Sequence, residues 1–293
     1  MNKIIAITLI TFSSQLCAQQ LYVWQQPDVK SAWDMGFKGQ SVTIHVHDDF
    51  IQSKLMANLE ITSTTSRSFN LSRQEMTHGD AVKTIARLTA PDATTTANQW
   101  VDGSITLTPD RLNIVNASYG WVGGTDPYNV AIARNLQITH MAMDNSAVVV
   151  KSAGNSNVQL SNNGGGDGIN IALKDGISVI FAGALGTHGS INKKAVKATY
   201  SNYPGNDSAY QSRFLMVGVD SSKMTIAGTS FAAPQISAYA AIVGSKFTGA
   251  DANQVTTQLL NTARTDTIKS YSRTLHGRGE ASLLRALAPV AIQ

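Results

Sequence analysis

The chain has 293 residues, of which 43% are apolar and only 14% are charged. This length suits one large α/β domain or two small ones, and the apolar content can form a sizeable core, which argues against a disordered or coiled-coil protein. The net charge of +4 is spread along the chain. No run of Lys or Arg is long enough to indicate nucleic-acid binding.

The N-terminus has the composition of a signal peptide. Lys3 precedes the apolar stretch 4–12, and Leu16-Cys17-Ala18 offers a cleavage site. The apolar stretch is too short to span a bilayer, although a short N-terminal membrane anchor is the alternative interpretation. We therefore expect a signal peptide at residues 1–18, a mature domain at residues 19–293, no membrane contact after cleavage, and export to the extracellular space or the periplasm.

Cys17 is the only cysteine of the chain, and cleavage after Ala18 would remove it. The mature protein would then hold no thiol and no disulfide, which excludes a cysteine nucleophile and every thiolate metal site. A core of this size can supply the stability of an exported protein without disulfides.

Strand patterns and helix patterns alternate along the rest of the chain. The predicted strands are apolar, largely β-branched runs at residues 42–46, 112–116, 147–151 and 177–182. The predicted helices cover residues 78–88, 126–143, 230–246 and 281–287, with one more that Asp251 caps. This alternation predicts a single three-layer α/β domain with a mostly parallel sheet, in which functional groups gather at the carboxyl ends of the strands.

Four polar residues stand where strands are predicted to end or helices to begin: Asp48, His78, Asn155 and Ser230. A serine hydroxyl is a weak nucleophile that needs a base, a partner that holds the base, and donors for the oxyanion that develops on the substrate. Taken alone, His78 and Asn155 are more often cap or turn residues, and Asp48 is as often an ordinary strand-end turn residue, but the four residues together supply every part. Asp49 remains the alternative carboxylate, because the choice depends on the strand register.

The order of these residues and their local contexts resembles the subtilases, the subtilisin-like serine proteases. The segment Gly228-Thr229-Ser230-Phe231-Ala232-Ala233-Pro234 is similar to the serine motif of that family almost letter for letter. The other similar segments are residues 36–48 around the aspartate, His78-Gly79, Ser118-Tyr119-Gly120, Ala153-Gly154-Asn155 and the closing residues 276–281. The resemblance covers roughly residues 24–288.

The resemblance implies an exported serine endopeptidase that acts through an acyl-enzyme. Ser230 would be the nucleophile, His78 the base and Asp48 the residue that orients the base. Asn155 would donate to the oxyanion. A protein or peptide substrate would bind along two segments of the chain, Ser118, Tyr119, Gly120 and Ser152, Ala153, Gly154. No cofactor is required for this chemistry; relatives often bind structural calcium, but no Asp-rich loop indicates it here.

Two departures from the family pattern flank the aspartate and the histidine. Phe50 stands where the family usually has glycine, and Asp80 stands where it usually has threonine. The interval from His78 to Asn116 is also short, so we expect this side of the domain to be trimmed. The residues before the first predicted strand leave no room for a propeptide, which implies folding without an internal chaperone or with help from a partner chain.

Two other functions stay open. One is a catalytically impaired binding protein or toxin-like subunit on the same scaffold, acting with a partner chain, to which Phe50 and Asp80 give some weight. The other is metal-dependent hydrolysis, because His45-Val46-His47-Asp48-Asp49 superficially resembles the motif of metallo-β-lactamase-like enzymes. That motif needs a histidine at Phe50, and strand alternation turns both histidines away from Asp48.

Overall fold

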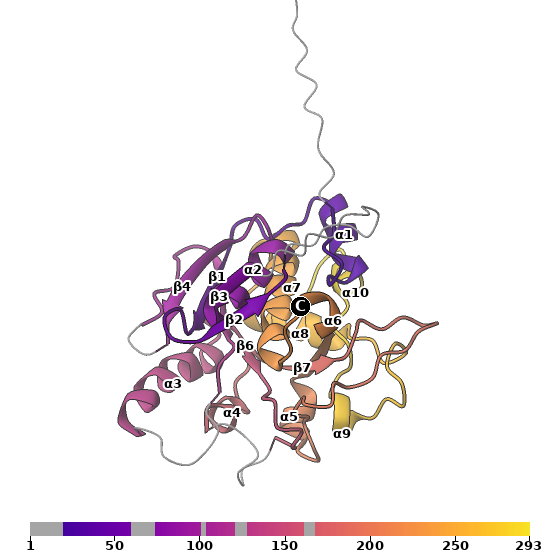
Figure 1. The fold of residues 1–293 in the computed structure, drawn as a ribbon. Coiled ribbons are helices and arrows are strands. Elements are labelled where there is room, and N and C mark those ends of the chain that lie inside the picture. Colours follow the sequence, from indigo (N-terminus) through magenta and orange to yellow (C-terminus); the bar gives the residue numbers. More distant parts are fainter. Residues whose placement is uncertain (1–19, 60–73, 101–103, 121–127, 161–167) are drawn as a thin grey trace, which may run out of the picture.

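A six-stranded sheet forms the centre of the protein, and every pair of neighbouring strands in it is parallel (Figure 1). The strand order is β4-β1-β5-β6-β7-β8. The strands are β1 (Val42–Asp48), β4 (Thr94–Gln99), β5 (Leu112–Ala117), β6 (Val148–Ser152), β7 (Val179–Leu185) and β8 (Phe214–Gly218). A separate antiparallel hairpin pairs β2 (Lys54–Ala57) with β3 (Gln74–Thr77).

The structure is a computed structural model that describes residues 20–59, 74–100, 104–120, 128–160 and 168–293. The predicted signal peptide and the predicted helix start at Asp126-Pro127 lie outside these residues. Within the described ranges, no helix is long and apolar enough to cross a membrane.

Helices cover both faces of the sheet, as the alternation of strands and helices predicts. One face carries α1 (Pro27–Asp34), α2 (His78–Thr89), α7 (Ala233–Lys246), α8 (Ala252–Asn261) and α10 (Leu283–Leu287). The other face carries α3 (Tyr128–Met143), α4 (Gly168–Leu173) and α5 (Ser208–Ser212). The short helices α6 (Ser221–Met224) and α9 (Arg273–His276) and the 3₁₀ turn η1 (Thr229–Phe231) complete the fold. Figure 1 shows α3 and α4 together, well away from α1 and α10.

The sequence of α7 explains how this helix lies across the middle of the sheet. Most of its residues are small or apolar, and nearly all of them are buried. A Cβ on Gly244 would lie 2.4 Å from Leu112 Cδ2, so the glycine lets the helix approach the start of β5 closely without displacing the Leu112 side chain. Because α7 follows the turn at Ser230 directly, this tight packing fixes the position of that serine relative to the strand ends.

The prediction of a three-layer α/β fold with a mostly parallel sheet is confirmed, but several details differ. The α-helix predicted from Ser230 begins at Ala233, after the 3₁₀ turn. Strands β4 and β8 were not predicted. Strand β4 lies between His78 and Asn116, where we expected a trimmed side of the domain, and it pairs along the whole of β1 except Val42. The expectation that this interval is trimmed is therefore wrong as far as a strand is concerned, because β4 is present. Residues 104–111 of the same interval hold no helix.

Candidate active site

Asp48 and His78 form a close pair at the carboxyl end of the first strand. Asp48 is the last residue of β1, and only 1% of it is exposed. Its Oδ1 atom lies 2.5 Å from His78 Nδ1, and the same oxygen accepts the main-chain N–H of Asp49 at 2.7 Å. A buried carboxylate at Nδ1 fixes the ring orientation and favours the proton on that nitrogen, which leaves Nε2 to act as a base.

Asp49, the alternative carboxylate, is used in the turn that follows β1. Its Oδ1 accepts the N–H groups of Ile51 and Gln52, and its Oδ2 accepts that of Ser53, each at 2.9 Å. Burial raises the pKa of the Asp49 carboxyl, but the hydrogen bonds from Gln52, Ile51, Ser53 and the Gln99 amide together outweigh it and lower the pKa to about 2. The structure therefore brings Asp48, and not Asp49, to the histidine.

His78 is the first residue of α2, and the two departures that flank it and Asp48, namely Asp80 and Phe50, both contact the start of this helix. Asp80 accepts the Thr77 hydroxyl at 2.7 Å, while that hydroxyl accepts the Asp80 N–H at 3.1 Å, which caps the helix. Phe50 packs over Gly79, where a Cβ would lie 2.8 Å from the Phe50 ring. Both residues thus hold the start of the helix that presents His78.

Ser230 lies in the 3₁₀ turn between Gly228 and α7. Gly228 has a φ of 139°, a conformation that L side chains rarely adopt, so the turn requires glycine at this position. The Ser230 hydroxyl donates to the carbonyl of Ser118 at 2.8 Å. Among the described residues no hydrogen bond joins Ser230 to His78, but the turn contacts α2, and the His78 and Phe231 ring centres are 5.4 Å apart.

Asn155 is exposed just beyond the end of β6, and Thr229 sets the orientation of its side chain. Asn155 Oδ1 accepts the Thr229 N–H at 2.8 Å and the Thr229 hydroxyl at 3.0 Å. The same hydroxyl accepts the N–H of Gly154 at 2.9 Å. Because both donors occupy Oδ1, the NH₂ group of the amide is left to donate elsewhere, as an oxyanion donor must. No sequence pattern singled out this role of Thr229 within the serine motif.

The two predicted substrate-binding segments continue neighbouring strands. Ser118-Tyr119-Gly120 follows β5, and Ser152-Ala153-Gly154 begins at the last residue of β6. The ring of Tyr119 stacks on Trp100, with their centres 5.8 Å apart, and meets the edge of His47 at 5.4 Å. The sequence offered no signal for Trp100, which follows the unpredicted strand β4.

The histidines proposed for the alternative metal site are engaged in the sheet. His45 is buried, and its two ring nitrogens lie 3.0 Å from Thr96 Oγ1 and 2.9 Å from Asn113 Oδ1. Burial lowers the pKa of His45, only partly offset by the bond to Asn113. Across the described part of the chain, no group of three or more His, Cys, Asp or Glu side chains is placed to hold a metal ion.

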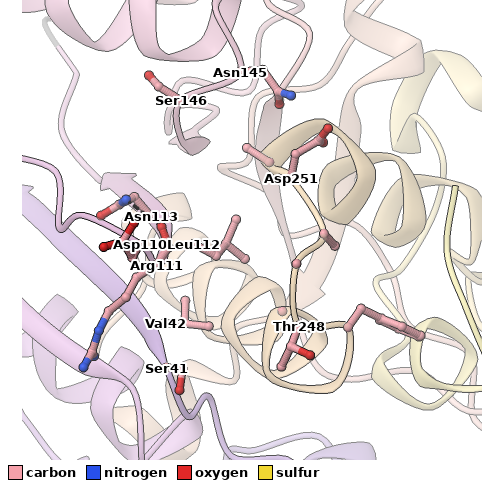
Figure 2. Close-up of a pocket in the computed structure, with 15 residues that line it drawn as sticks. Ser41, Val42, Asp110, Arg111, Leu112, Asn113, Asn145, Ser146, Thr248 and Asp251 are labelled. Atoms are coloured by element: carbon pink, nitrogen blue, oxygen red, sulfur yellow. Dashed lines mark hydrogen bonds between the residues drawn. The ribbon is translucent and has the colours of Figure 1, made fainter.

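A hollow of about 370 Å³ opens at the opposite end of the strands (Figure 2). Its lining includes Val42 and Leu112, the first residues of β1 and β5, together with Arg111 and Asp251. None of the candidate active-site residues lines it. In parallel sheets, ligands bind at the carboxyl ends of the strands, so the position of this hollow does not mark the reactive centre.

Replacing Asn155 with alanine is expected to lower the turnover of a peptide substrate about 10²- to 10³-fold with little change in KM, the size of effect known for such a donor in a subtilisin. The loss should affect turnover and not KM, because the amide would donate to the oxyanion that forms only in the transition state. Steady-state kinetics on purified protein measures it. A change confined to KM would contradict the oxyanion role.

A family model matches most of the chain, and solved structures share its fold. The model of the family described as "Subtilase family" (Peptidase_S8) matches residues 72–281. No curated protein matches the chain. At these low identities, the likeness to the following solved structures shows a shared fold. They are a lanthipeptide protease (18% identity, TM-score 0.57, 91% of this chain and 93% of that chain covered), the prenylagaramide maturation protease PagA (19%, 0.55, 89% and 98%) and the MycP3 protease from the type VII (ESX-3) secretion system (17%, 0.55, 92% and 91%).

Proposed function

We propose, since the chain belongs to the subtilase family of serine proteases, that it is an exported endopeptidase with Ser230 as its nucleophile. The observation that carries this proposal is the pair of Asp48 and His78, joined at 2.5 Å beside the turn that holds Ser230. Only 1% of Asp48 is exposed, and burying a charged carboxylate is costly unless it has a partner. A pair of this kind is therefore not expected for an ordinary surface histidine.

In the proposed mechanism, the Ser230 hydroxyl first leaves the Ser118 carbonyl by rotating about χ1 toward His78. Its oxygen then bonds to the scissile carbonyl carbon while His78 Nε2 takes the proton. The proton passes to the leaving amine as the C–N bond breaks, which leaves the acyl-enzyme. A water molecule then gives a proton to the same nitrogen as its oxygen bonds to the acyl carbon. The bond from that carbon to Ser230 breaks, the acid product leaves, and the proton returns to the Ser230 oxygen. Asp48 stabilises the charged imidazole throughout.

The developing oxyanion would be held by two donors, the Asn155 side chain and the Ser230 main-chain N–H. Thr229 supports this arrangement, because it fixes which end of the Asn155 amide points away from the protein. A peptide would lie along Ser118–Gly120 as an added strand, with its main chain hydrogen-bonded to that segment. Each of these contacts is available to any extended peptide, so the proposal covers protein and peptide substrates generally.

The hydrogen bond from Ser230 to Ser118 also lends weight to the second candidate, a binding protein without activity. The two functions separate in one experiment, cleavage of a diverse peptide library by the secreted protein, with products identified by mass spectrometry. We expect internal cleavage at a defined set of bonds. Release of terminal residues only would contradict the endopeptidase assignment, and intact peptides bound to folded protein would favour the binding function.

A further inference from the structure

Lys151 lies where the surrounding chain favours an apolar residue. It follows three valines in β6, and only 1% of it is exposed. The strand pairs with β5 on one side and β7 on the other, and lysine is almost never buried in such a position unless its ammonium is bonded. The serine protease mechanism described above makes no use of this residue.

The ammonium of Lys151 joins the two proposed substrate-binding segments. Its Nζ donates to the carbonyl of Tyr119 and, at 2.9 Å, to the carbonyl of Ser152, with the Ser152 hydroxyl at 3.3 Å. It also lies 5.6 Å from the centre of the Tyr119 ring. The last paired residues of β5 and β6 are Ala117 and Lys151. The Lys151 ammonium therefore connects the two segments just beyond the point where the pairing of these strands ends.

We infer that Lys151 is a positioning residue that holds these two segments at the spacing an extended peptide requires. The inference rests on the proposed function. The nucleophile Ser230 is hydrogen-bonded to Ser118 in one segment, and the oxyanion donor Asn155 directly follows Gly154 in the other. A peptide whose scissile carbonyl lies between Ser230 and Asn155 would therefore pass between the two segments. A charged donor makes stronger hydrogen bonds than a neutral one, which suits a tie between two carbonyl groups.

This role predicts different effects on short and long substrates. A small ester of one amino acid needs the catalytic groups of Ser230, His78 and Asp48 and the oxyanion donor Asn155, but not an extended binding segment. Asn155 is held separately by Thr229. An extended peptide also needs the main chain of Ser118–Gly120. Loss of the tie should therefore weaken the binding of the peptide and leave reaction with the ester nearly unchanged.

The test compares Lys151→Met with wild type on a single-residue ester and on an extended peptide, with rates divided by the fraction of protein that reacts with a fluorophosphonate. We expect kcat/KM for the peptide to fall about 10- to 100-fold, mainly through KM, as for a lost hydrogen bond to a charged group. The ester rate should change less than about threefold. Lys151→Gln, which keeps a donor, should recover part of the loss.

Lys246→Met is the matched control, because Lys246 also donates to two main-chain carbonyls, those of Leu287 and Pro289, at the far end of α7. It should leave both rates unchanged. Hydrolysis of the ester by wild type in the same assay tests the proposed function itself. With that activity present, equal losses on ester and peptide, or no loss on either, would overturn the positioning role of Lys151.

Discussion

Replacing Ser230 with alanine is expected to lower peptide hydrolysis about 10⁶-fold, the loss that follows removal of the nucleophile in a subtilisin. The fold should persist, because the substitution removes one half-buried hydroxyl and its hydrogen bond to Ser118, worth about 1 kcal/mol of the free energy of unfolding. Hydrolysis of an extended peptide, measured beside thermal unfolding of the same samples, checks both parts of this prediction.

Ser245→Ala is the control for the nucleophile variant. Ser245 is a half-buried serine near the far end of α7 whose hydroxyl also donates to a main-chain carbonyl, that of Ile242 at 2.7 Å, and accepts the Gly39 N–H at 3.3 Å. A similar small loss of stability is expected, with full activity. Near wild-type hydrolysis by Ser230→Ala would refute the assignment of the nucleophile, whatever the control shows.

Replacing Asp48 with asparagine is expected to lower kcat about 10⁴-fold while the protein stays folded, because the amide no longer favours the base form at His78 Nε2 or stabilises the charged ring. Steady-state kinetics measures the loss.

Asp49→Asn is the matched control, because the two carboxylates are adjacent in the chain and only one reaches the histidine. The Asp49 carboxyl has a pKa of about 2, below its ordinary 3.8, so its charge contributes stability above pH 3.8 that is lost as the pH falls toward 2. The variant should lack this stability at neutral pH, and its free energy of unfolding should fall less on acidification than that of the wild type. Its kcat per folded molecule should match wild type. Equal catalytic losses in both variants would contradict the selective role of Asp48.

The sequence predicted four of the six strands of the central sheet from buried runs rich in apolar and β-branched residues, but it missed β8, which is apolar on both faces. Strand β6 begins with three valines because it is covered on both faces. Strands β1 and β5 are also largely buried, but they mix β-branched residues with buried polar ones. Strand β4 was missed because it is an edge strand composed mainly of Thr, Asn and Gln residues, with a pattern that also fits a loop. Its hydrogen bonds come from β1, and no local pattern reports that pairing.

The candidate site was predictable as residue types and motifs but not as contacts. Both Asp48 and Asp49 fit a strand end, and only the register and the turn that follows show which carboxylate meets His78. Thr229 and Lys151 act through hydrogen bonds to segments far away in the chain, from 32 to 75 residues distant. Such roles depend on where parallel strands end relative to one another, which sequence spacing does not encode.

The most direct test of the central claim is to locate the adduct formed with a fluorophosphonate. The reagent should attach to folded wild-type protein at Ser230, identified by mass spectrometry of its peptides, and should react far more slowly with Asp48→Asn. Such a result would show that this serine is activated by the neighbouring pair. A folded protein that stays unlabelled, or that carries the adduct on another residue, would contradict the assignment of Ser230 as the nucleophile.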